Sequence, residues 1–280
     1  MPNHTTNLLT AADGMQLFTQ QWQPAGATKG VVLIVHGISE HSGRYAHVAA
    51  HLAEHGYATY SYDQRGHGRS PGLRAYVERF DDYLSDLDSY VAQVRLSMGK
   101  QPLFLLGHSM GGTVAALYTI TRQPAFNGLI LSSAALKVPA NVSPLLVRVA
   151  SLLSAVAPKR PITKLEINNL ARDPAVVQRY QADTLCYQGA TRARTGAEIL
   201  NAMQRIQAAA YKLTLPLLIF HGTADRITDP AGSQMVYDRA QSTDKTLTWY
   251  PDGYHETFND LDQGRVLGDL TTWLDKIITN

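Results

Sequence analysis

The 280-residue sequence has only one cysteine, Cys186, which excludes a disulfide within the chain. No spacing of cysteine and histidine resembles a zinc site, and we expect neither a metal nor a cofactor. Charged residues make up only 17% of the chain, and the formal net charge of +2 is spread over mixed signs. Because there is no basic face and no polybasic run, we do not expect nucleic acid as a partner.

Long apolar runs are absent as well. No stretch of about 18 apolar residues is available to span a bilayer. The start of the sequence, MPNHTTNLLTAADG, has neither the basic region nor the apolar region of a signal peptide. We therefore expect a cytoplasmic protein. Its length is sufficient to bury a large core.

Short apolar runs are present instead, and each has the length of one strand. Their hydrophobicity is continuous, which is typical of strands covered on both faces. Segments with helical spacing separate them, such as RYAHVAAHLAEHG (44–56) and FDDYLSDLDSYVAQVRL (80–96). This alternation predicts an α/β fold with a mostly parallel sheet and helices on both faces. The runs are VVLIV (31–35), YATYSY (57–62), PLFLL (102–106), GLILSS (128–133), PLLIF (216–220) and TLTWY (246–250).

The first residues predict a different arrangement. In TNLLTAADGMQLFTQQWQP (6–24), Asp13-Gly14 lies between two extended runs, which indicates a hairpin with a type I′ turn. An antiparallel hairpin therefore opens the predicted sheet and brings it to eight strands.

The alternation of strands and helices stops after residue 136. SPLLVRVASLLSAVAP (143–158) predicts an apolar helix, and the segment that follows it contains no convincing strand. We expect a helical cap over residues 137–206, inserted between two parts of one α/β core, residues 1–136 and 207–280.

The stretch LFLLGHSMGG (103–112) places Ser109 in the pattern G-x-S-x-G. The pattern alone is weak, but here it follows a predicted strand and precedes a predicted helix. This is the context of a nucleophile elbow, in which a sharp turn exposes the serine. A Cβ atom at Gly107 or Gly111 would collide with neighbouring backbone in such a turn. We therefore predict that Ser109 is a nucleophile.

A nucleophilic serine needs a base and an acid that orients the base, in the chain order serine, acid, histidine for this fold. HGTADRITDP follows one predicted strand and PDGYHETFND follows the last, so Asp225 and His255 are the predicted acid and base. Asp229 precedes Pro230 and is instead expected to cap a helix.

The oxyanion of an acyl-transfer intermediate needs backbone N–H donors. Met110 follows the nucleophile, and Ile38 lies in the loop after the strand VVLIV, so these two residues are the predicted donors. His108, inside the elbow, is expected to pack beside the site and to contact the substrate.

Five motifs, in this order, resemble the monoacylglycerol lipases of the α/β-hydrolase superfamily, particularly the bacterial members. The resemblance implies an α/β-hydrolase fold and a serine hydrolase that cleaves a lipid ester, a monoacylglycerol, to fatty acid and glycerol without a cofactor. It also implies the same roles for Ser109, Asp225 and His255. The motifs are HGISEHSGRY, DQRGHGRSPG, GHSMGG, HGTAD and YHETFND.

The resemblance places Glu40 and Arg44 near the glycerol end of the substrate; the alternative is a surface ion pair that orders the loop. One position departs from the mammalian enzymes, which have a second histidine where this chain has Phe258. The polar pocket for glycerol is therefore expected to differ.

Two other functions stay open at this point. A lysophospholipase or a carboxylesterase for short or aromatic esters would use the same three catalytic residues, and a non-catalytic ligand receptor on the same fold is a third reading. The apolar helix of the cap is expected to bind the acyl chain and to contact a membrane surface peripherally, with plain core packing as the alternative.

Overall fold

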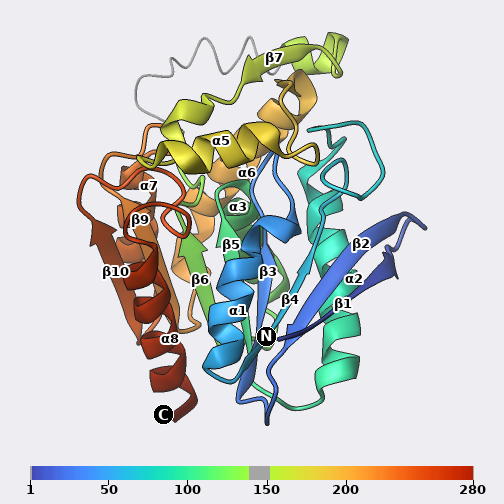
Figure 1. The fold of residues 1–280 in the computed structure, drawn as a ribbon. Helices are drawn as coiled ribbons and strands as arrows, with labels where there is room; N and C mark the ends of the chain where they lie inside the picture. Colours follow the sequence, from blue (N-terminus) through green and yellow to red (C-terminus); the bar gives the residue numbers. More distant parts are fainter. Residues whose placement is uncertain (1, 139–151, 280) are drawn as a thin grey trace.

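The computed structural model describes residues 2–138 and 152–279, and an eight-stranded sheet runs through it (Figure 1). The strand order is β1-β2-β4-β3-β5-β6-β9-β10, and every pair from β4 to β10 is parallel. The predicted mostly parallel α/β sheet is confirmed. The strands are β1 (Asn3–Thr10), β2 (Gln16–Gln23), β3 (Gly30–Val35), β4 (Tyr57–Tyr62), β5 (Leu103–His108), β6 (Gly128–Ser132), β9 (Leu217–Gly222) and β10 (Lys245–Tyr250).

The hairpin of β1 and β2 is present and antiparallel, with Thr10 opposite Gln16. Its predicted type I′ turn is wrong. That turn needs a positive φ at both central residues, whereas here Gly14 has a φ of 85° and Asp13 does not have a positive φ. The Gly14 N–H donates to Ala11 O at 2.9 Å, which closes a longer turn.

Helices cover both faces of the sheet because successive side chains of each strand point to opposite faces. Leu33 packs among helices α2 and α3, whereas Val32 and Ile34 pack on the other face with α1 and α8. Residues of α6 and α7 join the first of these two clusters. The helices are α1 (Ala46–Glu54), α2 (Phe80–Met98), α3 (Met110–Arg122), α6 (Ala193–Ala209), α7 (Pro230–Arg239) and α8 (Gln263–Thr279).

The described residues of the segment between β6 and α6, from 152 onward, lie over the carboxyl ends of the parallel strands (Figure 1). It includes α5 (Pro174–Ala182) and a small antiparallel pair of strands, β7 (Pro161–Lys164) and β8 (Ala190–Arg192). The expectation of a cap without strands is therefore wrong. All four residues of β7 are exposed, so no apolar pattern marks this strand in the sequence.

Two features bear on the expected limits of the cap. Helix α6 crosses the expected boundary between residues 206 and 207, and its Ala202 and Ile206 are buried with the core. Most of the apolar helix predicted over 143–158 lies outside the described residues; residues 152–156 are helical. Within the described ranges no helix is long and apolar enough to cross a membrane.

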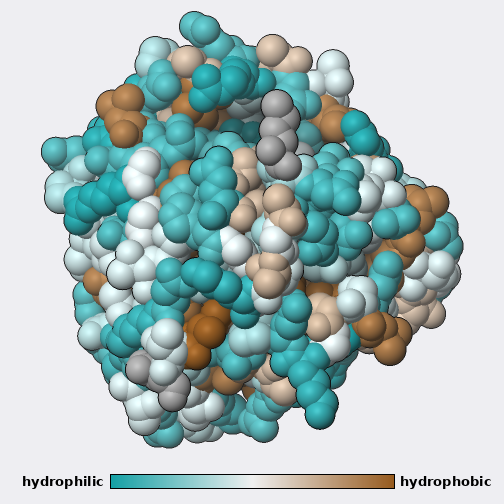
Figure 2. Space-filling view, turned by 60° about the horizontal axis from the view of Figure 1, so that its bottom comes forward, coloured by the Kyte–Doolittle hydropathy of each residue, from teal (hydrophilic) through white to brown (hydrophobic). Residues whose placement is uncertain are grey.

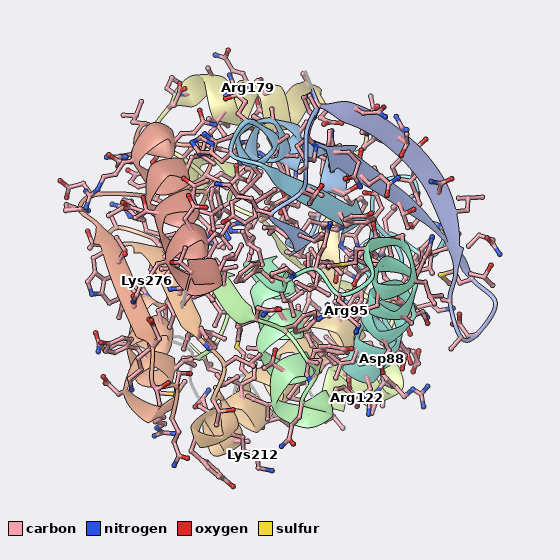
Figure 3. All side chains as sticks on the ribbon, turned by 90° about the horizontal axis from the view of Figure 1, so that it is seen from below. Asp88, Arg95, Arg122, Arg179, Lys212 and Lys276 are labelled. Carbon is pink, nitrogen blue, oxygen red and sulfur yellow. The ribbon has the colours of Figure 1, made fainter. Side chains whose placement is uncertain are left out.

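The side of the molecule away from the cap is largely hydrophilic in the view of Figure 2, with apolar residues scattered among polar ones. Seen from below, Arg122 and Asp88 form an exposed ion pair of 3.2 Å between α3 and α2, and Lys276 lies near the end of α8 (Figure 3).

Candidate active site

Ser109 lies in a sharp turn between β5 and α3, with φ of 53° and ψ of −121°. A non-glycine residue in such a conformation costs roughly 1–3 kcal/mol and persists only where its surroundings hold it. Here the Ser109 N–H donates to Ser132 O at 3.0 Å, and Ser109 O accepts from the Ala135 N–H at 3.1 Å. The neighbouring strand end thus holds the strained serine in place.

Two glycines make this turn sterically possible. A Cβ atom on Gly107 would lie 2.3 Å from Gly111 O, and one on Gly111 would lie 2.1 Å from Val35 O. Both distances are far below a van der Waals contact, so the structure bears out the predicted collisions.

Asp225 and His255 meet although 30 positions separate them in the sequence. Asp225 follows β9 and His255 follows β10, and these neighbouring parallel strands end at the same edge of the sheet. The His255 Nδ1–H donates to Asp225 Oδ2 at 2.8 Å, and both side chains are buried. This bond leaves Nε2 as the unprotonated nitrogen of a neutral His255.

Asp225 and His255 each shift the pKa of the other so that the charged form is favoured. Burial raises the pKa of Asp225, but the charge of His255 and hydrogen bonds from His221 and His255 outweigh it, so the pKa lies well below its usual range. Burial lowers the pKa of His255, but the carboxylate of Asp225 outweighs it and raises the pKa above its usual value. Asp225 is therefore ionised at neutral pH.

Ser109 and His255 line the same small cavity, together with Gly37 and Ile38. No hydrogen bond joins the Ser109 and His255 side chains among the contacts of the described residues. Such contacts are often long in a free enzyme and tighten when substrate binds.

The two predicted oxyanion donors flank Ser109 in different ways. Met110 is the first residue of α3, where backbone N–H groups lack a partner within the helix. Ile38 lines the cavity directly. The preceding N–H, that of Gly37, is already used, because it donates to Glu40 Oε1 at 2.6 Å.

Glu40 and Arg44 belong to a cluster that the sequence did not reveal in full, because its third member is Glu256, beside His255. Arg44 donates to both oxygens of Glu256 at 2.6 and 2.7 Å and to Glu40 Oε2 at 2.8 Å. The three side chains are at most 10% exposed, so this is a buried cluster and not a surface ion pair. Burial raises the pKa of Glu40, but Arg44 outweighs it, and the pKa falls to about 2.

His108 lies beside the pair, with its ring centre 4.8 Å from that of His255. Its Nδ1 is 3.2 Å from Ser132 Oγ, and it lines the cavity. Burial and the nearby His255 lower the pKa of His108 to about 4, so it is neutral at pH 7.

The described chain is similar over almost its whole length to proteins of one family. A family model described as serine aminopeptidase, S33, matches residues 26–262. A monoacylglycerol lipase of Mycolicibacterium smegmatis is 36% identical over 93% of each chain, and a monoglyceride lipase of Rattus norvegicus is 35% identical over 95% of this chain and 89% of its own. The chain belongs to the monoacylglycerol lipase family.

A solved structure agrees with this membership. The monoacylglycerol lipase of Paleococcus ferrophilus superimposes with a TM-score of 0.84 at 30% identity, and the match covers 94% of this chain and all of that one. The resemblance read from the motifs and the α/β-hydrolase fold are thus confirmed.

Phe258, three residues after His255, lies in the core. It is 2% exposed and packs edge to face on Phe220. Since it faces the core cluster under α8, it supplies no polar group to the cavity, whereas the buried Glu256 of the same loop lines it.

The cap closes the cavity with Leu165, Leu170 and Tyr180, and the remaining volume is about 10 Å³. This is room for roughly one water molecule. The Tyr180 hydroxyl donates to Ser39 O at 2.8 Å, which connects the cap to the loop after β3.

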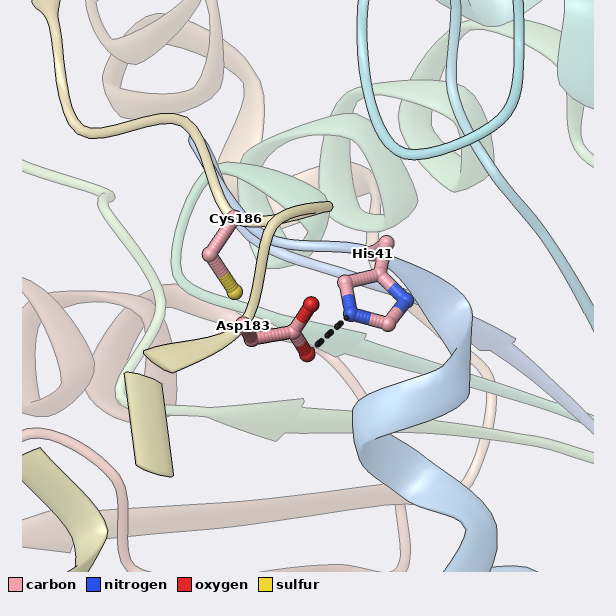
Figure 4. Close-up of side chains that lie close together, drawn as sticks. All are labelled: His41, Asp183 and Cys186. Atoms are coloured by element: carbon pink, nitrogen blue, oxygen red, sulfur yellow. Dashed lines mark hydrogen bonds and ion pairs between the residues drawn. The ribbon is translucent and has the colours of Figure 1, made fainter. Parts of the chain in front are cut away.

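One group among the described residues has the composition of a metal site, namely His41, Asp183 and Cys186 (Figure 4). The Gly43 N–H donates to His41 Nδ1, so Nε2 carries the proton that it shares with Asp183 Oδ2 at 2.8 Å. A metal would need the lone pair of Nε2 and a thiolate, yet burial raises the pKa of Cys186 well above its usual range. The cluster is better explained as a clamp between cap and core.

Proposed function

We propose that this protein is a serine hydrolase that cleaves monoacylglycerols to free fatty acid and glycerol, with Ser109 as nucleophile. The observation that carries the proposal is the strained turn at Ser109, which lines one cavity with His255, the partner of the buried Asp225. The names of the relatives support monoacylglycerol as the substrate.

In this mechanism His255 Nε2 removes the proton of Ser109 as its oxygen attacks the ester carbonyl. Asp225 holds the tautomer of His255 and stabilises the imidazolium that forms. The N–H groups of Ile38 and Met110 bind the oxyanion of the tetrahedral intermediate. His255 then gives the proton to the leaving alcohol, and water hydrolyses the acyl-enzyme by the same steps in reverse order.

The polar groups at the cavity support an uncharged alcohol such as glycerol as the leaving group. Glu40 and Glu256 line the cavity, and Arg44 behind them is already paired with both carboxylates. We place these residues and His108 near the glycerol end, where their acceptor atoms suit hydroxyl groups.

The proposal extends to the cap and to the membrane. We assign residues 137–206 to the cap and residues 1–136 and 207–280 to the core, with a peripheral membrane contact through the cap. Leu152 and Val156 support the contact, because they are 67% and 74% exposed on its helical segment and are followed by the cations Lys159 and Arg160. A cytoplasmic location completes the proposal; the single buried cysteine, which needs no oxidising compartment, supports it.

The activity is tested by fatty-acid release from monoacylglycerols of increasing chain length, a diacylglycerol, a lysophospholipid and short aryl esters. We expect the fastest turnover with monoacylglycerols and a loss of about 10⁴-fold or more in Ser109→Ala, with an unchanged fold. Preference for lysophospholipids or aryl esters would contradict the substrate, and release that persists in Ser109→Ala would contradict the nucleophile. Binding without turnover would indicate a receptor.

The membrane contact is tested by flotation with vesicles of mixed anionic and neutral phospholipids. We expect Leu152→Asp and Val156→Asp together to lower the bound fraction severalfold. Leu96→Asp is the control, since Leu96 is 88% exposed on α2. Equal binding of all variants would rule out this contact.

A further inference from the structure

His221, near the end of β9, is a buried histidine that the mechanism above does not use. Its side chain is fully buried, and its Nε2 lies 3.2 Å from Asp225 Oδ2, the oxygen that also accepts from His255. On the other side of the ring, Nδ1 lies 2.7 Å from the hydroxyl of Ser233, which is a buried residue of α7.

The proton positions follow from these contacts. If Nδ1 carried the only proton of a neutral ring, the lone pair of Nε2 would face the carboxylate of Asp225, which is repulsive. The consistent arrangement has the Ser233 hydroxyl donating to Nδ1 and the Nε2–H donating to Asp225 Oδ2. Ser233 therefore selects the tautomer of His221 that Asp225 requires.

Asp225 is held by donors on both of its oxygens. Oδ1 accepts the backbone N–H groups of Ile227 and Thr228 at 2.8 and 3.1 Å. Oδ2 accepts from His255, from His221 and from the Thr228 hydroxyl at 2.7 Å. The backbone bonds fix the position of the carboxylate, and the second histidine shares the negative charge on the oxygen that faces His255.

We propose that His221 is a positioning residue of the active site, which orients the carboxylate of Asp225 and moderates its charge, with Ser233 holding the tautomer of His221. The inference rests on the proposed function, because it assigns Asp225 as the acid that orients His255. A donor that shares the charge of Asp225 weakens the pull of this carboxylate on the proton of His255. Loss of His221 therefore makes His255 more basic and moves the acid limb of kcat/KM to higher pH.

Other titratable side chains also face His255, and a substitution of His221 leaves them unchanged. Glu256 follows it in the same loop, Glu40 approaches from the loop after β3, and both are paired with Arg44. His108 approaches from β5. None of them contacts His221 through a hydrogen bond within the described part of the chain, so a shift of the acid limb on changing His221 reports on Asp225.

The test measures kcat, KM and the pH profile of kcat/KM with monooctanoylglycerol for His221→Leu and His221→Gln. Gln carries an N–H at about the reach of Nε2, whereas Leu fills the space without a donor. We expect kcat of His221→Leu to fall about 10- to 100-fold, as for lost partners of metal-bound histidines, with KM changed less than about twofold and the acid limb raised by about half a pH unit. His221→Gln is expected to restore most of kcat and the pH profile.

The matched control is His67→Leu, which removes another buried histidine that does not contact Asp225 or His255. We expect a change in Tm and no shift of its acid limb. An unchanged kcat and acid limb in His221→Leu, or equal losses in His221→Gln and His221→Leu, would overturn the positioning role while leaving the hydrolase standing. Absence of Ser109-dependent hydrolysis in the unmodified protein would overturn both.

If His221→Leu does not fold, Ser233→Ala tests the inference instead, because it removes only the hydroxyl that holds the tautomer of His221. We expect a smaller loss of kcat, about 2- to 10-fold, and a shift of the acid limb in the same direction. A Ser233→Ala protein with the kcat and pH profile of the unmodified protein would overturn the inference.

Discussion

The core and the cap contribute to the candidate active site in different ways. The core side is called the floor below, and the cap side is called the roof. The floor consists of strand ends, where Ser109, Asp225 and His255 are held by backbone hydrogen bonds and by buried partners. The roof consists of cap residues such as Leu170 and Tyr180, which contact the floor through a few polar bonds at its rim. The geometry of the three proposed catalytic residues therefore belongs to the core, whereas residues of the cap cover the cavity beside them.

The two parts meet at the cluster of Glu40, Arg44 and Glu256. Glu40 accepts the Gly37 N–H of the loop after β3. Glu256 follows His255 in the chain, and the backbone N–H of Glu256 donates to Leu170 O of the cap at 2.8 Å. The guanidinium of Arg44 also lies 5.0 Å from the ring centre of Tyr180. One buried cation thus connects the loop after β3, the loop after β10 and the cap.

Among the changes considered, removal of the Arg44 charge is expected to lower the free energy of unfolding the most. Arg44→Met leaves two buried carboxylates without their shared cation, although hydrogen bonds from Gly37 and Asn259 remain, and breaking a buried ion pair typically costs about 3–5 kcal/mol. We expect a loss of this size in the free energy of unfolding measured in urea. Arg205→Met is the control, because its pair with Asp81 is exposed and is worth about 0–1 kcal/mol. Equal losses in both variants would mean that the cluster does not hold the two parts together.

The same cluster makes stability depend on pH. The pKa of Glu40 falls from 4.5 to about 2 on folding, so its contribution of about 3 kcal/mol is fully present above pH 4.5 and is lost as the pH falls towards 2. Urea unfolding between these pH values is expected to show this loss in the unmodified protein. In Glu40→Gln the dependence is expected to be correspondingly weaker, and an identical slope would assign it to other carboxylates.

The smallest loss of stability is expected when only a cap residue is changed. Tyr180→Phe removes the hydrogen bond to Ser39 O and keeps the ring over Arg44. We expect a loss of about 0.5–1.5 kcal/mol in unfolding free energy and a change in KM that exceeds the change in kcat. A fall in kcat with an unchanged KM would show instead that this bond positions the catalytic groups of the floor.

The comparison also shows which features can be read from the sequence. The central strands β3, β4, β5, β6 and β9 are predictable because their residues are buried throughout, which leaves continuous apolar runs. The strands β7 and β8 are not, because β7 is fully exposed and is specified by pairing with β8. The turn after β1 was misread because Asp13-Gly14 also suits a longer turn in which only the glycine needs a positive φ.

The sequence by itself determined the order of the core elements, the elbow around Ser109 and the three catalytic candidates, since short-range patterns and the ends of parallel strands specify them. Only the tertiary structure decided that Glu256 joins Arg44, 212 positions away, and that His221 shares the oxygen of Asp225 with His255. Contacts of this kind depend on how loops from distant strands meet. No local pattern encodes that meeting, because it is set by packing of the whole sheet and its helices.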